Sequence, residues 1–177
     1  MFFHFLKFFD YQIFVTVILI LIAWRWGDWR NWSRYYATIL FFIVGDFACT
    51  ILTYQYPLWQ FESALLKVTG SEFLIIAVFF PATLLVFLPH YPKEKRKQVW
   101  YILAWVVIYT AIEWISFLSG FFSYHNGWNI LWSALFNLLM FPLLILHQRK
   151  PPLAWLLGLI FAFCLLIYFK VPFSSMK

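Results

Sequence analysis

Long apolar runs alternate with short polar turns along the whole chain. Six of the runs are long enough to cross about 30 Å of hydrocarbon as helices that rise about 1.5 Å per residue. Because a backbone in lipid must satisfy its hydrogen bonds internally, such runs predict helices. The expected fold is all-α, a polytopic transmembrane bundle with six spans at about 10–26, 35–55, 71–90, 99–120, 129–147 and 153–171.

Composition indicates a membrane protein and excludes a soluble domain. Hydrophobic residues make up 64% of the chain and charged residues only 11%, whereas soluble domains keep about a quarter of their residues charged. A length of 177 residues suits one compact unit. We therefore expect residues 1–177 to form a single integral membrane domain.

The start of the chain does not resemble a cleaved signal. Met1–Asp10 lacks a basic segment followed by a small-residue cleavage site, so the first apolar run is expected to remain as a span. The two cysteines, Cys49 and Cys164, lie within apolar runs and have no metal-ligand spacing. We expect both to be small buried hydrophobic residues.

Basic residues predict the orientation in the membrane. The first, third and fifth turns hold nine Lys and Arg residues, against four at the termini and in the even turns. By the positive-inside rule the odd turns are cytoplasmic and both termini are extracytoplasmic. The net charge of +6 is thus explained by contact with anionic lipids at these turns, and no nucleic-acid partner is predicted.

The first turn is unusually rich in indole side chains. An indole has an apolar body and a polar edge, so it prefers the membrane interface. We interpret this turn as an interfacial anchor, and a binding site for anionic lipid headgroups is the alternative. The predicted anchors are Trp24, Arg25, Trp26, Trp29, Arg30 and Trp32.

Asp46 and Glu113 are carboxylates within predicted spans. A charge near the bilayer centre costs at least about 2.5 kcal/mol, so such residues usually face a protein interior or a wet cavity and mark a functional site. No Lys or Arg lies at the same depth to neutralise them. They are therefore expected to be protonated, bound to a cation or solvated.

Helix rise places the two carboxylates in one layer with Asn137. From the predicted outer ends of their spans, Asp46, Glu113 and Asn137 lie at depths of about 13, 10 and 12 Å. This predicts a polar layer in the outer half of the membrane. Helical spacing and the tight-turn pair Asn126-Gly127 extend the candidate site to Thr50, Glu72, Tyr109, His125, Asn129 and Ser133.

Simpler roles are open for several of these residues. Asn137 and Ser133 can serve only as hydrogen-bonding groups between helices, at about 0.6 kcal/mol each. His125 can be a solvated turn residue. Glu72 can be an acidic first-turn residue that the helix dipole favours.

Two further features concern the shape of the bundle. Pro81 and Pro142 lie inside predicted spans, where each frees a backbone carbonyl and permits a bend beside the polar layer. The sixth span offers only Cys164 and Tyr168 as polar groups. We therefore expect it at the lipid-facing periphery.

Three functions fit these observations. The first is a site that binds or transports a proton, a cation or a small amine-bearing solute on the carboxylates. The second is a structural or assembly role without a ligand. The third is an intramembrane enzyme on a lipid-like substrate, against which stands the absence of any known catalytic motif in the sequence. No particular cofactor, metal or oligomeric state is indicated, and no catalytic residue is assigned.

Several stretches also resemble a known family. They are Gly27–Trp32, Tyr36–Asp46, Leu52–Trp59, Tyr124–Asn129 and Pro151–Trp155. Together they are similar to small multi-pass membrane proteins of spore-forming Firmicutes that carry a clostridial locus-tag name. The resemblance covers most of the chain and implies a bacterial plasma-membrane protein. It carries over no catalytic or binding residues.

Overall fold

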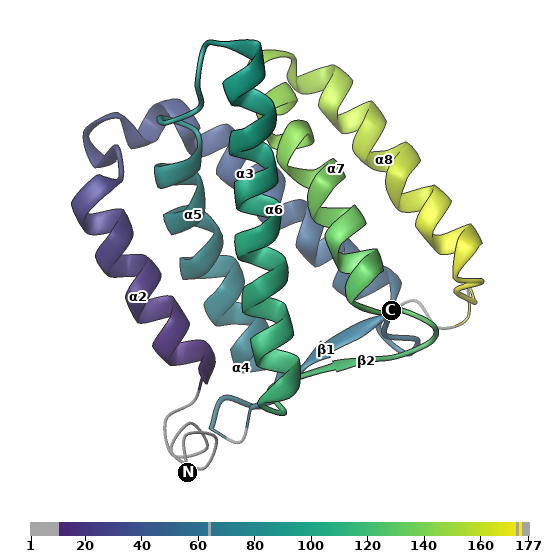
Figure 1. The fold of residues 1–177 in the computed structure, drawn as a ribbon. Coiled ribbons are helices and arrows are strands. Elements are labelled where there is room, and N and C mark those ends of the chain that lie inside the picture. The colour runs from purple at the N-terminus through teal and green to yellow at the C-terminus, as the bar shows by residue number, and fades with distance from the viewer. Residues whose placement is uncertain (1–10, 64, 173, 175–177) are drawn as a thin grey trace.

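A computed structural model describes residues 11–63, 65–172 and 174. Its helices form a bundle that is crossed at one end by a two-stranded ribbon (Figure 1). The helices are α2 (Tyr11–Trp26), α3 (Trp32–Leu52), α4 (Lys67–Leu74), α5 (Phe80–Phe87), α6 (Lys95–Leu118), α7 (Ile130–Arg149) and α8 (Pro151–Tyr168). The strands are β1 (Trp59–Phe61) and β2 (Phe122–Tyr124).

Two of the predicted spans are assembled from several helical segments. A 3₁₀ turn, η1 (Trp29–Asn31), precedes α3. A π-helical turn, η2 (Ile75–Phe79), joins α4 to α5 so that helix runs over Lys67–Phe87. Pro81 follows η2 and cannot donate a backbone hydrogen bond, which accounts for a local change of helix type. Pro142 lies inside α7, which continues through it.

The prediction of an all-helical bundle is confirmed. Within the described part of the chain, five helices are long and apolar enough to cross a membrane. The remaining one, α2, has 16 described residues. The start of the first predicted span, Asp10, and the basic residues Lys7 and Lys177 lie outside the described residues.

The lateral order of the helices follows from their contacts. Helix α2 packs against α5, α5 against α3, and α3 against α7. Helix α7 also contacts both α6 and α8. Only Ala154 of α8 is buried, which confirms that the last helix lies at the periphery.

The main core fills the end of the bundle that carries the basic turns. Its largest fully buried side chains are Phe87, Phe141, Leu84 and Leu144. Phe87 stacks on Tyr101 with ring centroids 5.5 Å apart. In lipid, such close van der Waals packing replaces the hydrophobic effect as the main attraction between helices.

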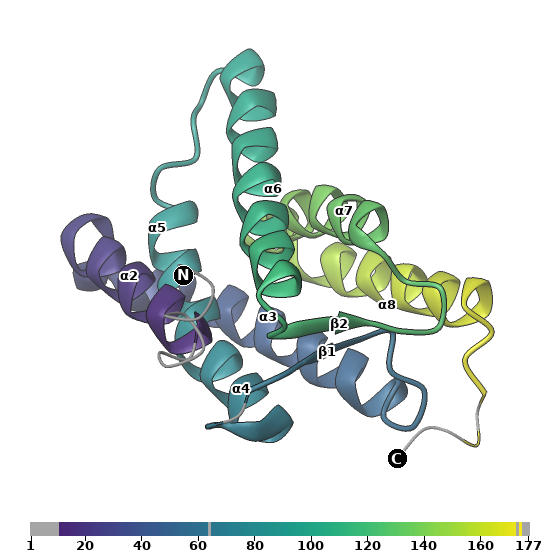
Figure 2. The same cartoon turned by 60° about the horizontal axis from the view of Figure 1, so that its bottom comes forward.

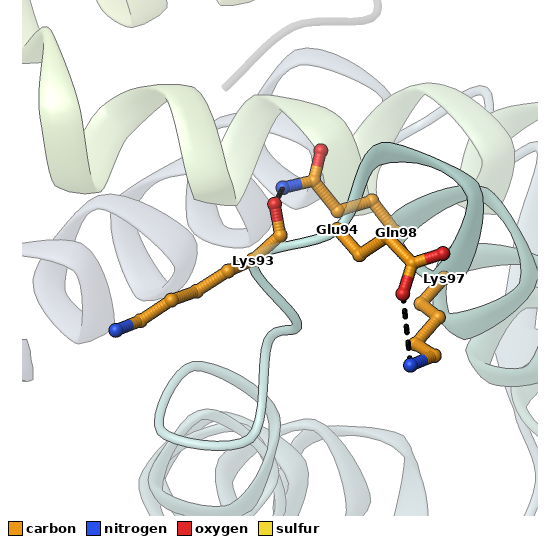
Figure 3. A network of polar contacts seen from close by, with 4 residues as sticks. All are labelled: Lys93, Glu94, Lys97 and Gln98. Carbon is orange, nitrogen blue, oxygen red and sulfur yellow. Dashed lines mark hydrogen bonds and ion pairs between the residues drawn. The ribbon is translucent and has the colours of Figure 1, made fainter.

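The turn between α5 and α6 illustrates the basic end (Figure 3). Lys97 forms an ion pair with Glu94 at 2.8 Å, and the two side chains are 71% and 58% exposed. The amide of Gln98 donates to the backbone carbonyls of Pro92 at 3.0 Å and Lys93 at 3.3 Å. An exposed ion pair contributes little to stability, so the backbone contacts of Gln98 do more to shape this turn.

The opposite end is closed by the antiparallel pairing of β1 with β2. Trp59, Gln60 and Phe61 pair with Tyr124, Ser123 and Phe122, respectively. Figure 2, with this end turned forward, shows the ribbon running across the bundle. The pairing joins two loops that lie more than 50 residues apart in sequence, and the helix pattern did not predict it.

The predicted tight turn after β2 is confirmed. Asn126 and Gly127 have φ angles of 51° and 87°, and the Trp128 amide donates to the His125 carbonyl at 2.9 Å. Positive φ at both central positions is typical of a type I′ turn. A second hydrophobic cluster forms beside this turn, made of Leu58, Trp128, Phe169 and Val171.

Candidate functional site

A cavity of about 270 Å³ lies between the main core and the ribbon. Its lining includes Phe41 and Leu144 of the core, and Trp59 and Trp128 at the ribbon end. For comparison, an engineered apolar cavity of about 150 Å³ binds benzene. The space is therefore large enough for a small organic ligand.

The two carboxylates of the candidate site line this cavity together. Asp46 comes from α3 and Glu113 from α6. Asn137 of α7 is the third polar group of the predicted layer and lines the same cavity. From the ribbon-side ends of their helices, these residues lie at depths of about 9, 8 and 11 Å. Side chains from three separate helices thus line the cavity at nearly the same level along the bundle.

Glu113 is held by the ribbon. The Tyr124 hydroxyl donates a hydrogen bond to Glu113 Oε1 at 2.8 Å, and Ser133 lies beside the same carboxyl group. The Trp128 indole in turn donates to Ser133 Oγ at 2.8 Å. Burial raises the pKa of Tyr124, and the adjacent Glu113 carboxylate raises it further. Tyr124 therefore stays protonated and able to donate.

Asp46 has a different environment. It is half-buried, and it forms no hydrogen bond or ion pair with any other residue that the structure describes. Glu72 is its electrostatic neighbour and carries a charge of the same sign. The neighbouring Gly45 has open space where a side chain would begin. The oxygens of Asp46 are accordingly free to contact a ligand.

The other candidates on α6 and α7 have identified partners. The Tyr109 hydroxyl donates to Thr83 Oγ1 at 2.7 Å, and the Asn137 amide donates to Thr110 Oγ1 at 3.4 Å. Tyr109 and Ser133 also line the cavity. These groups form interhelical contacts and contribute polar surface at the same time.

The rest of the larger candidate site does not reach the cavity. Thr50, Glu72, His125 and Asn129 are not among its lining residues. The Asn129 side chain caps α7 by accepting from the amides of Leu131 and Trp132. Asn129 is therefore explained by helix capping.

The ribbon presents two different faces. Trp59, Phe61 and Phe122 line the cavity. On the other face, the Ser123 hydroxyl donates to Glu62 Oε1 at 3.1 Å and lies 2.9 Å from His125 Nε2. This alternation of apolar and polar residues is visible in the sequence segments Trp59–Glu62 and Phe122–His125, and period-two alternation is the signal for a half-buried strand.

Two cavity residues on α2 were not predicted. Gln12 and Thr16 are both buried and line the cavity. Gln12 donates to the Phe121 carbonyl at 3.4 Å, and the Tyr11 hydroxyl donates to the Ile112 carbonyl at 3.2 Å. The spacing of Gln12 and Thr16, four residues apart in an otherwise apolar run, places both on one helix face and is the signal that identifies them.

The only ionisable side chains in the described lining that can carry a charge near neutral pH are the acidic residues Asp46 and Glu113. Among its described lining residues there is no Lys, Arg or His, and 13 of the 34 are aromatic. Within the described ranges, no group of three or more His, Cys, Asp and Glu residues is arranged to hold a metal ion. No basic side chain of the described residues is therefore placed in the lining to neutralise Asp46 or Glu113, and a proton or a cationic ligand could fill that role.

The cysteines occupy different environments. Cys49 is half-buried and lines the cavity. Cys164 is exposed, so the expectation that it is buried is wrong. The reason is that α8 packs mainly on α7 and leaves most of its surface uncovered.

The indole-rich first turn is exposed. The four predicted anchors Trp24, Trp26, Trp29 and Trp32 are between 47% and 74% exposed. The Trp29 indole donates to the Ala23 carbonyl, and the Arg25 guanidinium lies 5.6 Å from the Trp26 ring centroid. This arrangement leaves the indoles free to contact the membrane interface.

A further polar cluster at the basic end was not predicted. His147 is buried, and its Nδ1 lies 3.0 Å from Thr38 Oγ1. The Thr38 hydroxyl also lies 2.8 Å from Gln148 Oε1. His147 stacks on Phe41 with ring centroids 4.3 Å apart. The cluster joins α3 to α7 at the end of the bundle away from the ribbon.

Comparisons with known proteins find no match for this chain among family models, curated proteins or solved structures. The function is therefore inferred from the site itself.

Proposed function

We propose that the protein is a multi-pass protein of a bacterial plasma membrane that binds or transports a cation in an intramembrane carboxylate cavity. The cation is a proton, a metal ion or a small amine-bearing solute. In this proposal six helices span the membrane, both termini are extracytoplasmic, and the cavity lies in the outer half of the bilayer. The resemblance of the sequence to membrane proteins of spore-forming Firmicutes supports the bacterial location.

The observation that carries the proposal is the placement of Asp46 and Glu113. Both line one cavity that has no basic residue among its described lining. A carboxylate at this depth in a membrane is costly unless it is paired or neutralised. A bound cation or proton removes this cost. The carboxylate oxygens of Asp46 form no hydrogen bond or ion pair with a described residue and can therefore contact such a cation.

The distribution of basic residues supports the orientation. Arg25, Arg30, Lys93, Arg149 and other basic residues lie in the three turns at the end away from the ribbon. A membrane-impermeant maleimide distinguishes the two orientations in intact cells, after replacement of Cys49 and Cys164 by Ala. The proposed topology predicts labelling of Gln60→Cys and protection of Lys93→Cys. The reverse pattern would contradict it.

The binding proposal is tested by thermal unfolding of the purified protein. Mono- and divalent metal chlorides and methylammonium are the probes. At a ligand concentration of 100 Kd, stabilisation of about 2.7 kcal/mol is expected, which corresponds to a shift in Tm of several degrees. Asp46→Asn and Glu113→Gln should reduce this shift. Because a proton is a candidate, the Tm is also compared between about pH 5 and pH 8.

The matched control is Glu94→Gln, which removes a carboxylate at the opposite end of the bundle from an exposed ion pair. This variant should respond to every probe as the unchanged protein does. The proposal is abandoned if Asp46→Asn and Glu113→Gln leave both the ligand response and the pH response unaltered.

A further inference from the structure

We infer that the ligand of this cavity is an amphipathic amine, an ammonium group with an apolar tail, which reaches the cavity sideways between α3 and α8. This inference rests on the proposed cation site and specifies its ligand class. It follows from the distribution of polar and apolar residues in the lining of the cavity, from the cavity volume and from the position of its opening.

One wall of the cavity, formed by α8, carries no polar side chain, whereas the helices that supply the polar groups contribute apolar residues as well, such as Phe41 and Phe136. The carboxylates and the amide are supplied by α3, α6 and α7, through Asp46, Glu113 and Asn137. In contrast, α8 lines the cavity only with apolar and aromatic residues such as Trp155 and Phe161. A ligand that fills the whole space must therefore be charged at one end and apolar at the other.

A bare metal ion matches this lining poorly. Hard divalent ions need six or more oxygen ligands, and the cavity supplies two carboxylates from separate helices among mainly apolar walls, in which 13 of the 34 lining residues are aromatic. An ammonium group needs fewer contacts, and aromatic faces attract it through cation–π interactions. The chemistry of the walls thus favours an organic cation.

The volume indicates the size of the tail. Scaled from a cavity of about 150 Å³ that holds the six carbons of benzene, a space of 270 Å³ accommodates about eleven non-hydrogen atoms. An ammonium group with an aliphatic tail of about eight carbons fits this estimate. Longer tails would extend out of the cavity.

The opening lies along the seam between α3 and α8. Val44 on α3 and Leu159 on α8 both line the cavity and are 46% and 65% exposed. A side chain at Gly45 would meet no atom within 4 Å. A smaller void of about 20 Å³, lined by Cys49 and Ala162 among others, follows the same seam.

The seam lies beside α8, the helix that the sequence predicts to face lipid. The ribbon, in contrast, covers one end of the cavity. Trp59, Phe61 and Phe122 occupy that end. A ligand with an apolar tail partitions into the bilayer and is thereby concentrated at the seam. Access from the lipid side therefore suits the same ligand class that the walls favour.

The test is a series of n-alkylammonium chlorides from two to twelve carbons, added to the protein in nanodiscs of uncharged lipid. Affinity is measured by calorimetry for the unchanged protein, for Asp46→Asn and for the Glu94→Gln control. Binding that depends on Asp46 should strengthen about fourfold per methylene, because each methylene leaves water whether it fills the cavity or extends through the seam into lipid. Subtraction of the Asp46→Asn signal removes simple partition into lipid.

Each outcome has a distinct meaning. If short and long amines bind equally in an Asp46-dependent way, the inference fails and the proposed cation site stands. If octylammonium binds Asp46→Asn as tightly as the unchanged protein, the inference also fails. If neither carboxylate affects any cation or the pH response, the proposed function fails, and the inference with it.

The route is tested by filling the seam. Gly45→Phe should slow association of octylammonium at least tenfold, whereas Ala104→Phe, on an exposed part of α6 away from the lining, should not. Ala162→Phe fills the opposite wall and replaces Gly45→Phe if that variant does not yield folded protein. Unchanged association rates in the folded seam variant would overturn lateral access.

Discussion

The hydroxyl of Tyr124 donates a hydrogen bond to Glu113 Oε1 at 2.8 Å. One of these residues belongs to the ribbon at the end of the bundle and the other to helix α6. The contact joins the β1–β2 ribbon, which covers one end of the cavity, to one of the two carboxyl groups that line the cavity. Any change in the charge of Glu113 therefore acts directly on a residue of the ribbon.

Replacing Tyr124 by Phe should destabilise the protein. The variant keeps the ring and removes the donor, so it should lose about 1 to 3 kcal/mol of unfolding free energy, as expected for a hydrogen bond to a carboxylate. Chemical unfolding in detergent provides the measurement. Tyr168→Phe is the matched control, because Tyr168 is exposed and its change should have little effect. Equal stability of the two variants would show that the contact contributes nothing.

The contribution of Tyr124 should also depend on pH at the alkaline end. Burial and the Glu113 carboxylate raise its pKa above the ordinary value of 10.0. In the unfolded chain Tyr124 ionises near pH 10, whereas in the folded protein it keeps its proton to higher pH. Its stabilising contribution is thus complete below about pH 10 and is lost as pH rises through the higher folded value.

The corresponding measurement compares Tm for the unchanged protein and Tyr124→Phe at about pH 8 and pH 11. The difference should become smaller at the higher pH. A difference that stays constant, or grows, would mean that the folded protein does not hold the Tyr124 proton more tightly than the unfolded chain does.

Two glycine substitutions should have opposite effects. Gly127 has a φ of 87°, so Gly127→Ala should cost about 1 to 2 kcal/mol, because an L side chain is strained there. Gly45 is within α3, where a Cβ meets no neighbour, so Gly45→Ala should keep or raise stability. Thermal unfolding of both variants gives the signs, and a stable Gly127→Ala variant would argue against this turn.

The pairing of the ribbon can be tested by cross-linking. Gln60 and Ser123 are directly opposed in the β1–β2 register. With Cys49 and Cys164 replaced by Ala, Gln60→Cys and Ser123→Cys should form a disulfide under mild oxidation. Gln60→Cys with Phe122→Cys is the control, since its side chains point to opposite faces. Cross-linking that is equal in both pairs would contradict the register.

The sequence by itself determined the helical character of the bundle and the level along the helices at which the polar groups lie. A chain that crosses hydrocarbon must satisfy its backbone hydrogen bonds within each helix, so a long apolar run specifies a helix without knowledge of its neighbours. Helix rise then converts sequence position to depth, which is why Asp46, Glu113 and Asn137 could be assigned to one layer.

Only the tertiary structure decided how these helices are rotated and ordered. Lipid and protein core are both apolar, so the pattern does not distinguish the face that packs from the face that meets lipid. For this reason helical spacing groups Thr50 with Asp46 although Thr50 does not line the cavity, whereas Gln12 lines it without being indicated by the carboxylates. The pairing of Trp59 with Tyr124 likewise depends on two loops brought together by the helices that carry them. Contacts of this kind arise from packing in three dimensions, which a one-dimensional pattern of polarity does not specify.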